Sequence, residues 1–300
     1  MEAYQKIEQS ILKKYKKTIW NRMIGGIKDY QLIQPGDKIA VCISGGKDSM
    51  LLAKCLHMLH RHTEIPFELE FMSMDPGYNE QNREMILQNA ERLQLPVTVF
   101  PTKIFDIVSN AGGNPCYLCA RMRRGHLYAK AKELGCNKIA LGHHFDDVIE
   151  TSLMSMLYAA EVRTMMPKLP STNFEGMEII RPFYLVRERD ILAWKRYNDL
   201  IFVQCGCPLS ETAPVCSEES CGSDAESGGK RAMVKQLISQ LRKNNPQVDI
   251  NIFRSMHNVN LDTVIGYRQN GEKHSFLEHY AVPAMQETSP TEPNRKEGLD

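Results

Sequence analysis

The stretch that decides the fold of this chain is Ser44-Gly45-Gly46-Lys47-Asp48-Ser49. It lies between an apolar run, residues 38–43, and a segment at 50–56 whose apolar residues are typical of a helix. A glycine pair between a buried strand and a helix leaves backbone N–H groups at the positive end of the helix dipole, where anions bind. Two serine hydroxyls and a lysine ammonium group add donors, so the stretch predicts a cradle for pyrophosphate.

Spacing separates this stretch from two other phosphate-binding loops. The Walker A loop needs Gly-x4-Gly-Lys-Ser/Thr and the dinucleotide fingerprint needs Gly-x-Gly-x-x-Gly, and neither pattern is present here. The stretch instead resembles the PP-loop Ser-Gly-Gly-x-Asp-Ser of the ATP-pyrophosphatase superfamily, which implies cleavage of ATP between its α and β phosphates to adenylate an oxygen. The alternative is a tight strand-to-helix turn in which Asp48 or Ser49 caps the helix.

Composition places the chain among ordinary globular proteins. Its 300 residues are 42% hydrophobic and 24% charged with a net charge of +1, which suits one large α/β domain with attachments or two modest domains. No apolar run reaches transmembrane length and the N-terminus is unlike a secretory signal, so we expect a cytoplasmic protein with no membrane partner. The nine cysteines then predict ligands or nucleophiles instead of disulfides. The near-zero charge confines any nucleic-acid contact to local patches.

Strand-like and helix-like segments alternate along residues 38–181, which predicts a parallel sheet with helices on both faces. The strand candidates are 38–43, 67–74, 97–101, 138–141 and 177–181, and the helix candidates are 4–30, 49–62, 80–93, 118–134, 147–160, 189–198 and 230–243. The predicted class is a doubly wound α/β fold, mostly parallel, with helical N- and C-terminal additions. Ligands bind such sheets where the strand order reverses, which in PP-loop folds lies between the first and fourth strands. Those strands lead into 44–49 and 142–147, so two polar clusters should meet in one crevice.

Changes in composition divide the chain into four regions. They are a basic N-terminal helix region at 1–34, an ATP-binding domain at 35–200, a C-terminal helical region at 201–283 and a disordered tail at 284–300. Within the third region, residues 211–229 are rich in Ser, Glu and Gly, and we expect them to form a mobile loop.

Cys116 and Cys119 form the strongest cysteine pair, because two thiolates one helical turn apart can chelate a metal ion or one face of a cluster. A redox pair, or two cysteines that merely begin a helix, is the alternative. A zinc ribbon needs a second Cys-x-x-Cys, which the sequence lacks. A [4Fe–4S] cluster on three cysteines fits better, with Cys207 or Cys205 as the third ligand. The thiols with apolar sequence neighbours are expected in the core: Cys42, Cys55 and Cys136.

Several further motifs occur in order: Pro-Cys-Tyr-Leu-Cys at 115–119, Arg-Met-Arg-Arg-Gly at 121–125, Lys-Ile-Ala-Leu-Gly-His-His-Phe-Asp-Asp at 138–147, Met-Pro-Lys-Leu at 166–169 and Ile-Arg-Pro at 180–182. With them the chain resembles the TtcA family of PP-loop enzymes, which 2-thiolate a cytidine in the tRNA anticodon loop. The similarity runs from about Ile33 to Cys207, and more loosely to Asn258. It implies ATP, Mg2+ and a three-cysteine [4Fe–4S] cluster as cofactors.

The resemblance also implies roles for individual residues. The ATP-binding residues would be Ser44, Gly45, Gly46, Lys47, Asp48, Ser49, Met74, Asp75, Gly142 and His143. Asp48 with Asp146 or Asp147 would hold Mg2+, whose charge offsets the charge that develops at the α-phosphate. Asp48, Arg123 and Asp147 would act in catalysis, with Arg123 contacting the transition state or the tRNA. A helix-capping role for Asp146 and Asp147 is the alternative, and it is compatible with metal binding.

One departure from the family concerns the third cluster ligand. TtcA proteins commonly carry Cys-x-x-Cys in the C-terminal region, whereas this chain has Cys205-x-Cys207. In the related TtuA enzymes, which thiolate uridine, the third ligand precedes a proline, as Cys207 does here. The resemblance therefore favours Cys207 as the third ligand, with Cys205 as the alternative.

Partners follow from the same resemblance. They are the tRNA anticodon loop, held by the basic helices 4–30 and 230–243, and a cysteine desulfurase or other sulfide donor; a homodimer is left open. Other PP-loop reactions on tRNA, 2-thiouridine formation or lysidine-type ligation, are alternative functions, as is a metal-bound tRNA-binding module without catalysis. The loop at 44–49 argues against the non-catalytic module, and the cysteine pair argues against a ligase.

Overall fold

The structure is a computed structural model that describes residues 2–110, 115–203 and 229–280, without the side chains of Pro115 and Cys116. Its contacts divide the chain into two units, residues 1–256 and 257–300. Three sequence predictions fall outside the described residues: the tail at 284–300, the loop at 211–229 apart from Gly229, and the positions of Cys205 and Cys207. None of the helices in the described ranges has the length and apolar character needed to cross a membrane.

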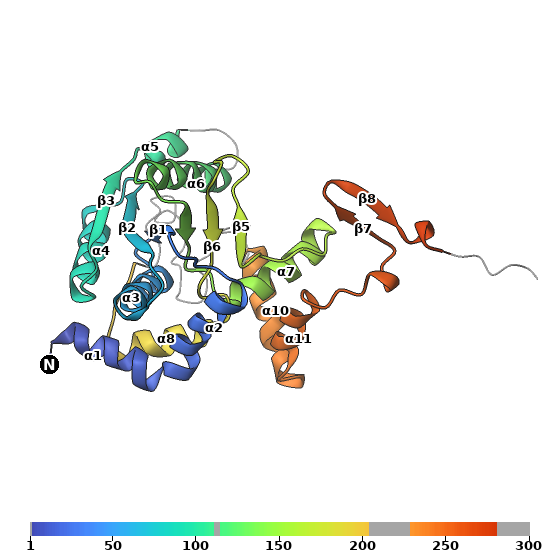
Figure 1. Ribbon diagram of the computed structural model, residues 1–300, viewed down its shortest axis with the longest axis horizontal. Coiled ribbons are helices and arrows are strands. Elements are labelled where there is room, and N and C mark those ends of the chain that lie inside the picture. Colours follow the sequence, from blue (N-terminus) through green and yellow to red (C-terminus); the bar gives the residue numbers. More distant parts are fainter. Residues whose placement is uncertain (1, 111–114, 204–228, 281–300) are drawn as a thin grey trace, which may run out of the picture. The chain divides into compact units, whose positions relative to one another are not determined.

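A six-stranded sheet with the order β3-β2-β1-β4-β6-β5 forms the centre of the first unit (Figure 1). Its strands are β1 (Lys38–Ile43), β2 (Glu68–Asp75), β3 (Val97–Pro101), β4 (Lys138–Ala140), β5 (Lys168–Pro170) and β6 (Glu178–Ile180). β1 pairs in parallel with β2 on one side and with β4 on the other, and Val41 lies opposite both Phe71 and Ala140. The strand order therefore reverses between β1 and β4, and the predicted fold class is confirmed.

The edge strand β5 is an element that the sequence does not predict. It has only three residues and runs antiparallel to β6, with Leu169 opposite Ile179. A strand this short cannot show the alternation of apolar and polar residues on which strand prediction depends. Its last residue, Pro170, is tolerated because an edge strand need not donate a hydrogen bond on its outer side.

Helices cover both faces of the sheet because successive residues of a strand point to opposite sides. Ile39 and Val41 of β1 pack in one cluster with α3 (Lys47–His62), α8 (Glu188–Tyr197) and the N-terminal segment. Ala40 and Cys42 pack in another with α6 (Pro115–Glu133). Further helices of this unit are α4 (Glu80–Arg92), α5 (Ile104–Ser109), α7 (Phe145–Ala159), α10 (Lys230–Asn244) and α11 (Val248–Ser255).

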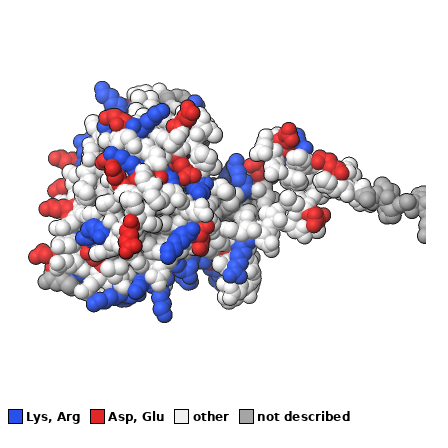
Figure 2. All heavy atoms as spheres, in the orientation of Figure 1, with Lys and Arg blue, Asp and Glu red and all other residues white. Residues whose placement is uncertain are grey.

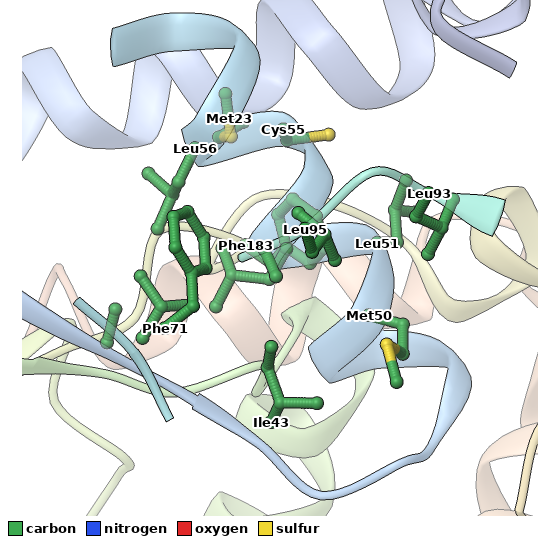
Figure 3. Packing of buried hydrophobic residues seen from close by; sticks show 14 of the residues in the cluster. Met23, Ile43, Met50, Leu51, Cys55, Leu56, Phe71, Leu93, Leu95 and Phe183 are labelled. Carbon is green, nitrogen blue, oxygen red and sulfur yellow. The ribbon is translucent and has the colours of Figure 1, made fainter. Parts of the chain in front are cut away.

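Figure 3 shows how α3 is fixed against the sheet. Met50 and Leu51 in its first turns are fully buried, and they belong to the same core cluster as Ile43 and Phe71 of the sheet and Phe183. Each such side chain contributes roughly 1.5–3 kcal/mol on burial. The loop at 44–49 is therefore held between a buried strand and a buried helix, which leaves it little freedom.

The N-terminal segment is a mixed run of helix types and not the single regular helix predicted over 4–30. It consists of α1 (Ala3–Gln9), the π-helices η1 (Ser10–Lys14) and η2 (Lys16–Trp20), and α2 (Asn21–Asp29). Its buried apolar residues recur every four positions: Ile7, Ile11, Tyr15, Ile19, Met23 and Ile27. In a regular α-helix each four-residue step turns about 40° too far, so this stripe would rotate away from the core. The wider i→i+5 turns correct that drift.

The described part of the second unit, residues 257–280, is built around a hairpin of β7 (Gly266–Gln269) and β8 (Glu272–Ser275). Asn270 and Gly271 join the strands with φ of 54° and 89°, which a type I′ turn requires at both central positions. Two short 3-10 turns flank the hairpin, η3 (Leu261–Thr263) and η4 (Phe276–Glu278). No residue from 257 to 280 is buried.

Candidate active site

A cavity of about 410 Å³ opens at the carboxyl ends of β1 and β4, where the strand order reverses. Its volume is in the range of small-molecule sites. Nine of the predicted site residues line it: Ser44, Lys47, Asp48, Ser49, Met74, Arg123, Gly142, His143 and Asp147. The two polar clusters, 44–49 and 142–147, thus meet in one cavity, although they are separated by almost a hundred residues of sequence.

The loop at 44–49 turns sharply from β1 into α3. Gly45 has φ of +85°, and a Cβ there would come within 2.7 Å of Ile86, so only glycine fits. The N-cap of α3 is Gly46, which corrects the alternative in which Asp48 or Ser49 caps this helix. The Ser49 hydroxyl instead accepts from the Ser44 backbone N–H (3.1 Å) and donates to the Gly46 carbonyl (3.0 Å). The first turn of α3 is thereby tied back to the loop, with its N-terminal end facing the cavity.

Gly142 lets the second cluster approach the first. A Cβ at this position would lie 3.0 Å from the carbonyl carbon of Asp48 and 3.0 Å from the backbone nitrogen of Ser49. These are backbone atoms that cannot move aside without shifting the start of α3. Gly142 is therefore required for packing, and this role differs from direct contact with a ligand.

The start of α7 brings Asp147 to the cavity. His144 is the N-cap, and its ring Nδ1 accepts from the Asp147 backbone N–H (3.4 Å) while the Asp147 carboxylate accepts from the His144 N–H (2.9 Å). Burial alone would raise the pKa of Asp147, but His144, His143 and Arg231 together lower it. The carboxylate is thus ionised, oriented and directed toward the cavity.

Asp146 and Asp75 are placed elsewhere. Asp146 is buried beside a different cavity, where its carboxylate accepts from the Glu188 backbone N–H (2.8 Å) and pairs with Arg242 (3.1 Å). Asp75 accepts from the backbone N–H groups of Gly77 (2.9 Å) and Tyr78 (2.8 Å) and holds together the turn after β2. Neither carboxylate lines the cavity at the carboxyl ends of β1 and β4.

Lys47 lies between two carboxylates of the cavity. Its Nζ is 3.2 Å from Asp48 Oδ2 and 3.3 Å from Glu188 Oε1. Burial alone would lower the pKa of Lys47, but these two carboxylates outweigh it and raise the value. The ammonium group is therefore charged at neutral pH and is available to an anionic ligand.

Three charged lining residues are absent from the sequence predictions: Glu188, Arg231 and Lys235. Glu188 is the first residue of α8, and Arg231 and Lys235 come from α10. The sequence offers one weak signal for the latter two, since residues four apart share one face of a helix. That helix is expected above to hold tRNA, whereas in the structure three of its cations, Arg231, Lys235 and Arg242, pair with carboxylates of the same unit.

The donors at the cavity fit a magnesium ion bound with a nucleotide. Asp48 Oδ1 is buried and has no hydrogen-bond partner among the described residues. Asp147 lines the same cavity with an ionised carboxylate. Mg2+ typically takes one or two protein carboxylates and completes its shell with water and phosphate oxygens. Among the described residues there is no group of three or more His, Cys, Asp or Glu side chains that could hold a metal ion.

The cysteine positions can be followed only in part. Cys119 lies half-buried on α6, one turn before Arg123, which lines the cavity and donates to the Tyr78 hydroxyl (3.3 Å). Cys116 belongs to the first turn of α6, and its side chain is outside the described atoms. The three thiols expected in the core are buried, and burial raises the pKa of Cys42 to about 12 and that of Cys136 to about 11. Thiols of this kind are poor ligands and nucleophiles.

The doubly wound sheet and the Ser-Gly-Gly-x-Asp-Ser cradle at its switch point define a PP-loop protein, and the family model described as PP-loop domain matches residues 5–205. The chain is 35% identical over 249 residues to the tRNA-cytidine(32) 2-sulfurtransferase of Geobacter sulfurreducens, covering 82% of this chain and 91% of the relative. It is 34% identical to the protein of that name in Syntrophotalea carbinolica, covering 84% and 92%. The chain therefore belongs to the PP-loop family of tRNA-cytidine(32) 2-sulfurtransferases, and the predicted TtcA membership is confirmed.

A solved structure supports the fold. The U34-tRNA thiolase NcsA of Methanococcus maripaludis, determined with its [4Fe–4S] cluster, superposes with a TM-score of 0.60 at 20% identity. The match covers 79% of this chain and 76% of that one. At this identity the likeness concerns the arrangement of strands and helices, which is the PP-loop fold.

Proposed function

We propose that this chain is an ATP-dependent tRNA sulfurtransferase that replaces the C2 oxygen of an anticodon-loop cytidine with sulfur. One observation carries the proposal: the PP-loop cavity is lined by Arg123 of α6, one turn after Cys119 on the same helix. A site that activates an oxygen with ATP thus adjoins a helix whose cysteine pair can serve sulfur chemistry. The relatives named tRNA-cytidine(32) 2-sulfurtransferase give the substrate class.

ATP would bind along the loop at 44–49. The backbone N–H groups at the start of α3 and the side chains of Ser44, Lys47 and Ser49 would hold its phosphates. Asp48 and Asp147 would hold Mg2+, which, when bound, supplies positive charge against the charge that develops on the phosphates. We prefer Asp147 to Asp146 here because Asp146 is paired with Arg242 at another cavity.

The chemistry proceeds in two displacements. The cytidine O2 attacks the α-phosphorus of ATP, and the bond to the bridging oxygen breaks so that pyrophosphate leaves with the electron pair. Hydrosulfide then adds at C2, the C2–O bond breaks, AMP departs and the sulfur proton is released. Arg123 is suited to the charge on the α-phosphate or to the tRNA backbone, because its guanidinium lines the cavity.

A [4Fe–4S] cluster would be held by Cys116, Cys119 and Cys207, with Cys205 as the alternative to Cys207. When bound, a three-cysteine cluster offers one iron without a protein ligand, at which hydrosulfide can be carried. The cysteine pair suits such a cluster because Cys116 and Cys119 lie one turn apart at the start of α6. The last described residue before Cys207 lies beside the PP-loop, since the Val203 N–H donates to the Gly45 carbonyl (3.2 Å).

Contacts with tRNA are proposed for the N-terminal segment, whose lysines at 13, 14, 16 and 17 are exposed. In the view of Figure 2, Lys and Arg side chains gather along the lower edge of the first unit, where this segment lies. A free sulfide donor would supply the hydrosulfide directly, whereas a cysteine desulfurase would need a thiol reductant as well, because its persulfide sulfur must gain two electrons to leave as hydrosulfide. Light scattering on the purified protein would decide whether it forms a homodimer.

The test is anaerobic purification followed by iron analysis and by assay with ATP, sulfide and a tRNA transcript. We expect about four irons per chain and 2-thiocytidine in the digested tRNA, measured by mass spectrometry. Cys119→Ser should lose the cluster and the product, whereas Cys136→Ser, at a buried core thiol, should retain both. Zinc without iron would refute the cluster, and 2-thiouridine or lysidine as the product would refute the cytidine assignment.

A further inference from the structure

Two cations of α10 form one wall of the PP-loop cavity. Arg231 and Lys235 lie four residues apart, on one face of the helix, and both line the cavity together with Lys47 and Asp48. Their side chains are 33% and 41% exposed, so a ligand in the cavity can reach them. Neither residue belongs to the PP-loop motif, and each is brought to the site by the docking of α10 on α7.

Each of the two cations is held by a pair of carboxylates. Arg231 Nη1 is 3.1 Å from Asp147 Oδ1 and 3.0 Å from Glu150 Oε2. Lys235 Nζ is 3.1 Å from Glu188 Oε2 and 3.7 Å from Glu150 Oε1. Glu150 is buried, contacts both cations and does not line the cavity. Asp147 and Glu188 are themselves part of the cavity lining.

Lys47 of the PP-loop and Lys235 of α10 converge on one group. Lys47 Nζ contacts Glu188 Oε1 at 3.3 Å, and Lys235 Nζ contacts the other oxygen of the same carboxylate at 3.1 Å. The two ammonium groups therefore face each other across a single side chain. An anion with oxygens on two phosphorus atoms can replace this carboxylate and contact both sides at once.

We propose that Arg231 and Lys235 bind the pyrophosphate portion of ATP, opposite the PP-loop, and hold it as the leaving group. The proposal rests on the function proposed above, which makes ATP the ligand of this cavity. In it, phosphate oxygens take the places of Asp147 beside Arg231 and of Glu188 beside Lys235, while Glu150 keeps both side chains in position. The planar guanidinium can donate two parallel hydrogen bonds to one phosphate group.

The charges of the cavity agree with this assignment. Its lining has four cations, Lys47, Arg123, Arg231 and Lys235, and three carboxylates, Asp48, Asp147 and Glu188. Without the two cations of α10 the carboxylates of the lining would outnumber its cations, and a triphosphate would meet less compensating charge from the protein. AMP lacks the β and γ phosphates, so its binding should not depend on α10.

The experiment measures nucleotide affinity by isothermal titration calorimetry on the full-length protein, with Mg2+ and either α,β-methylene ATP or AMP. The methylene analogue is used because it cannot be cleaved between the α and β phosphates. For Arg231→Gln we expect the Kd of the ATP analogue to rise by about tenfold or more, since a charge-assisted hydrogen bond to phosphate is lost. The Kd of AMP should change by less than about twofold, and Lys235→Gln should behave in the same way.

Arg242→Gln is the matched control. Arg242 lies on the same helix and also joins α10 to a carboxylate of α7, Asp146 at 3.1 Å, but it lines another cavity. The Arg242→Gln substitution therefore weakens the docking of α10 on α7 but removes no cation from the nucleotide site. Arg231→Lys should recover part of the affinity for the ATP analogue, because it restores the charge.

The outcomes separate this proposal from the one on which it rests. Equal losses for the ATP analogue and AMP, or the same selective loss in Arg242→Gln, would mean that α10 acts only through packing and would overturn the pyrophosphate site. A selective loss confined to Arg231→Gln and Lys235→Gln supports it. That result would stand even if the wild-type protein made no 2-thiocytidine, in which case only the proposed function would fail.

Discussion

A missing side chain at position 142 allows the two halves of the cavity to meet. Gly142→Ala would place its Cβ 3.0 Å from two backbone atoms at the start of α3, so we expect destabilisation by about 1–3 kcal/mol. Because the shift falls on the loop that binds phosphate, ATP affinity should fall as well. Urea denaturation and calorimetry with ATP measure the two effects.

Gly125→Ala controls for the loss of a glycine as such. Gly125 lies within α6, and a Cβ there would meet nothing within 4 Å. Alanine favours a helix over glycine by up to about 1 kcal/mol, so this variant should be neutral or more stable. If Gly142→Ala were as stable as Gly125→Ala and bound ATP as well as the wild type, the close approach at residue 142 would not matter.

His143 predicts a pH dependence of stability. The residue is half-buried, its Nδ1 is buried without a hydrogen-bond partner among the described residues, and desolvation lowers its pKa to about 4. An unfolded histidine has a pKa of about 6.5. As the pH falls from about 6.5 toward 4, residue 143 becomes protonated in the unfolded chain but stays neutral in the folded chain. The free energy of unfolding therefore falls in this window. At neutral pH the ring is therefore uncharged.

The measurement is urea denaturation at pH 7 and pH 4.5, without nucleotide. Between these values the wild type should lose about 2–3 kcal/mol more than His143→Gln, which has no proton to take up. His62→Gln, at an exposed position, is the control and should follow the wild type. Identical pH dependence in the wild type and His143→Gln would show that residue 143 contributes nothing to it.

The neighbours Asp146 and Asp147 mark a limit of sequence reasoning at the residue scale. The loop at 44–49 could be predicted as a site because its ligating groups are contiguous in sequence and its glycines permit the sharp turn between strand and helix. Two adjacent aspartates at a helix start differ by about 100° in direction. Which one faces the cavity depends on where the helix begins, and here the N-cap falls on His144. If the start of the helix were predicted one residue too early or too late, the wrong aspartate would be predicted to face the cavity.

At the scale of elements, the N-terminal segment is fixed by charge as well as by its apolar stripe. Lys54 of α3 is fully buried, and its Nζ pairs with Glu8 of α1 at 2.7 Å and donates to the Leu93 carbonyl at 2.8 Å. Burial lowers the pKa of Lys54, although Glu8 opposes that effect. Glu8→Gln would leave this ammonium group without its counter-ion, so we expect a loss of about 3 kcal/mol in the free energy of unfolding.

A double variant separates the cost of an unpaired charge from the loss of packing. Glu8→Gln/Lys54→Met should be more stable than Glu8→Gln alone, because the buried charge is gone while the side-chain volume remains. Glu133→Gln provides a surface comparison, since its pair with Lys130 lies on an exposed helix face and should be worth less than about 1 kcal/mol. If Glu8→Gln cost no more than Glu133→Gln, the segment would be held by apolar contacts alone.

Elements with strong local signals could be predicted, and those that depend on distant contacts could not. The four parallel pairings of the sheet follow from apolar runs such as Lys38–Ile43, each with a helix before the next strand. The hairpin at 266–275 had a usable local signal in Asn270-Gly271, which is typical of a two-residue turn. The sequence has no local signal for the position of α10. Its partners on α7 lie some eighty residues away in sequence, and its direction follows from tertiary packing.

At the scale of the whole molecule, the second unit adds no buried residue to the protein in its described part. Residues 257–280 are all exposed or half-exposed, and their one sheet is a two-stranded hairpin, which is marginally stable in isolation. The residues that line the nucleotide cavity all lie between 42 and 235. A chain that ends at Met256 should therefore fold, melt within a few degrees of the full-length protein and bind ATP with unchanged affinity.

Calorimetric melting and ATP titration of the shortened chain test this expectation. The internal comparison is a chain that ends at Asn245, before α11, which removes the buried Phe253 and with it the ring stacked on Phe145 at 4.5 Å. That chain should lose several kcal/mol of stability, because a buried phenylalanine contributes about 3–5 kcal/mol when it is removed. Loss of ATP binding on truncation at Met256 would instead make the second unit part of the nucleotide site. If ATP binding is retained in the chain that ends at Met256 and lost in the chain that ends at Asn245, the boundary of the catalytic unit lies between α11 and the hairpin.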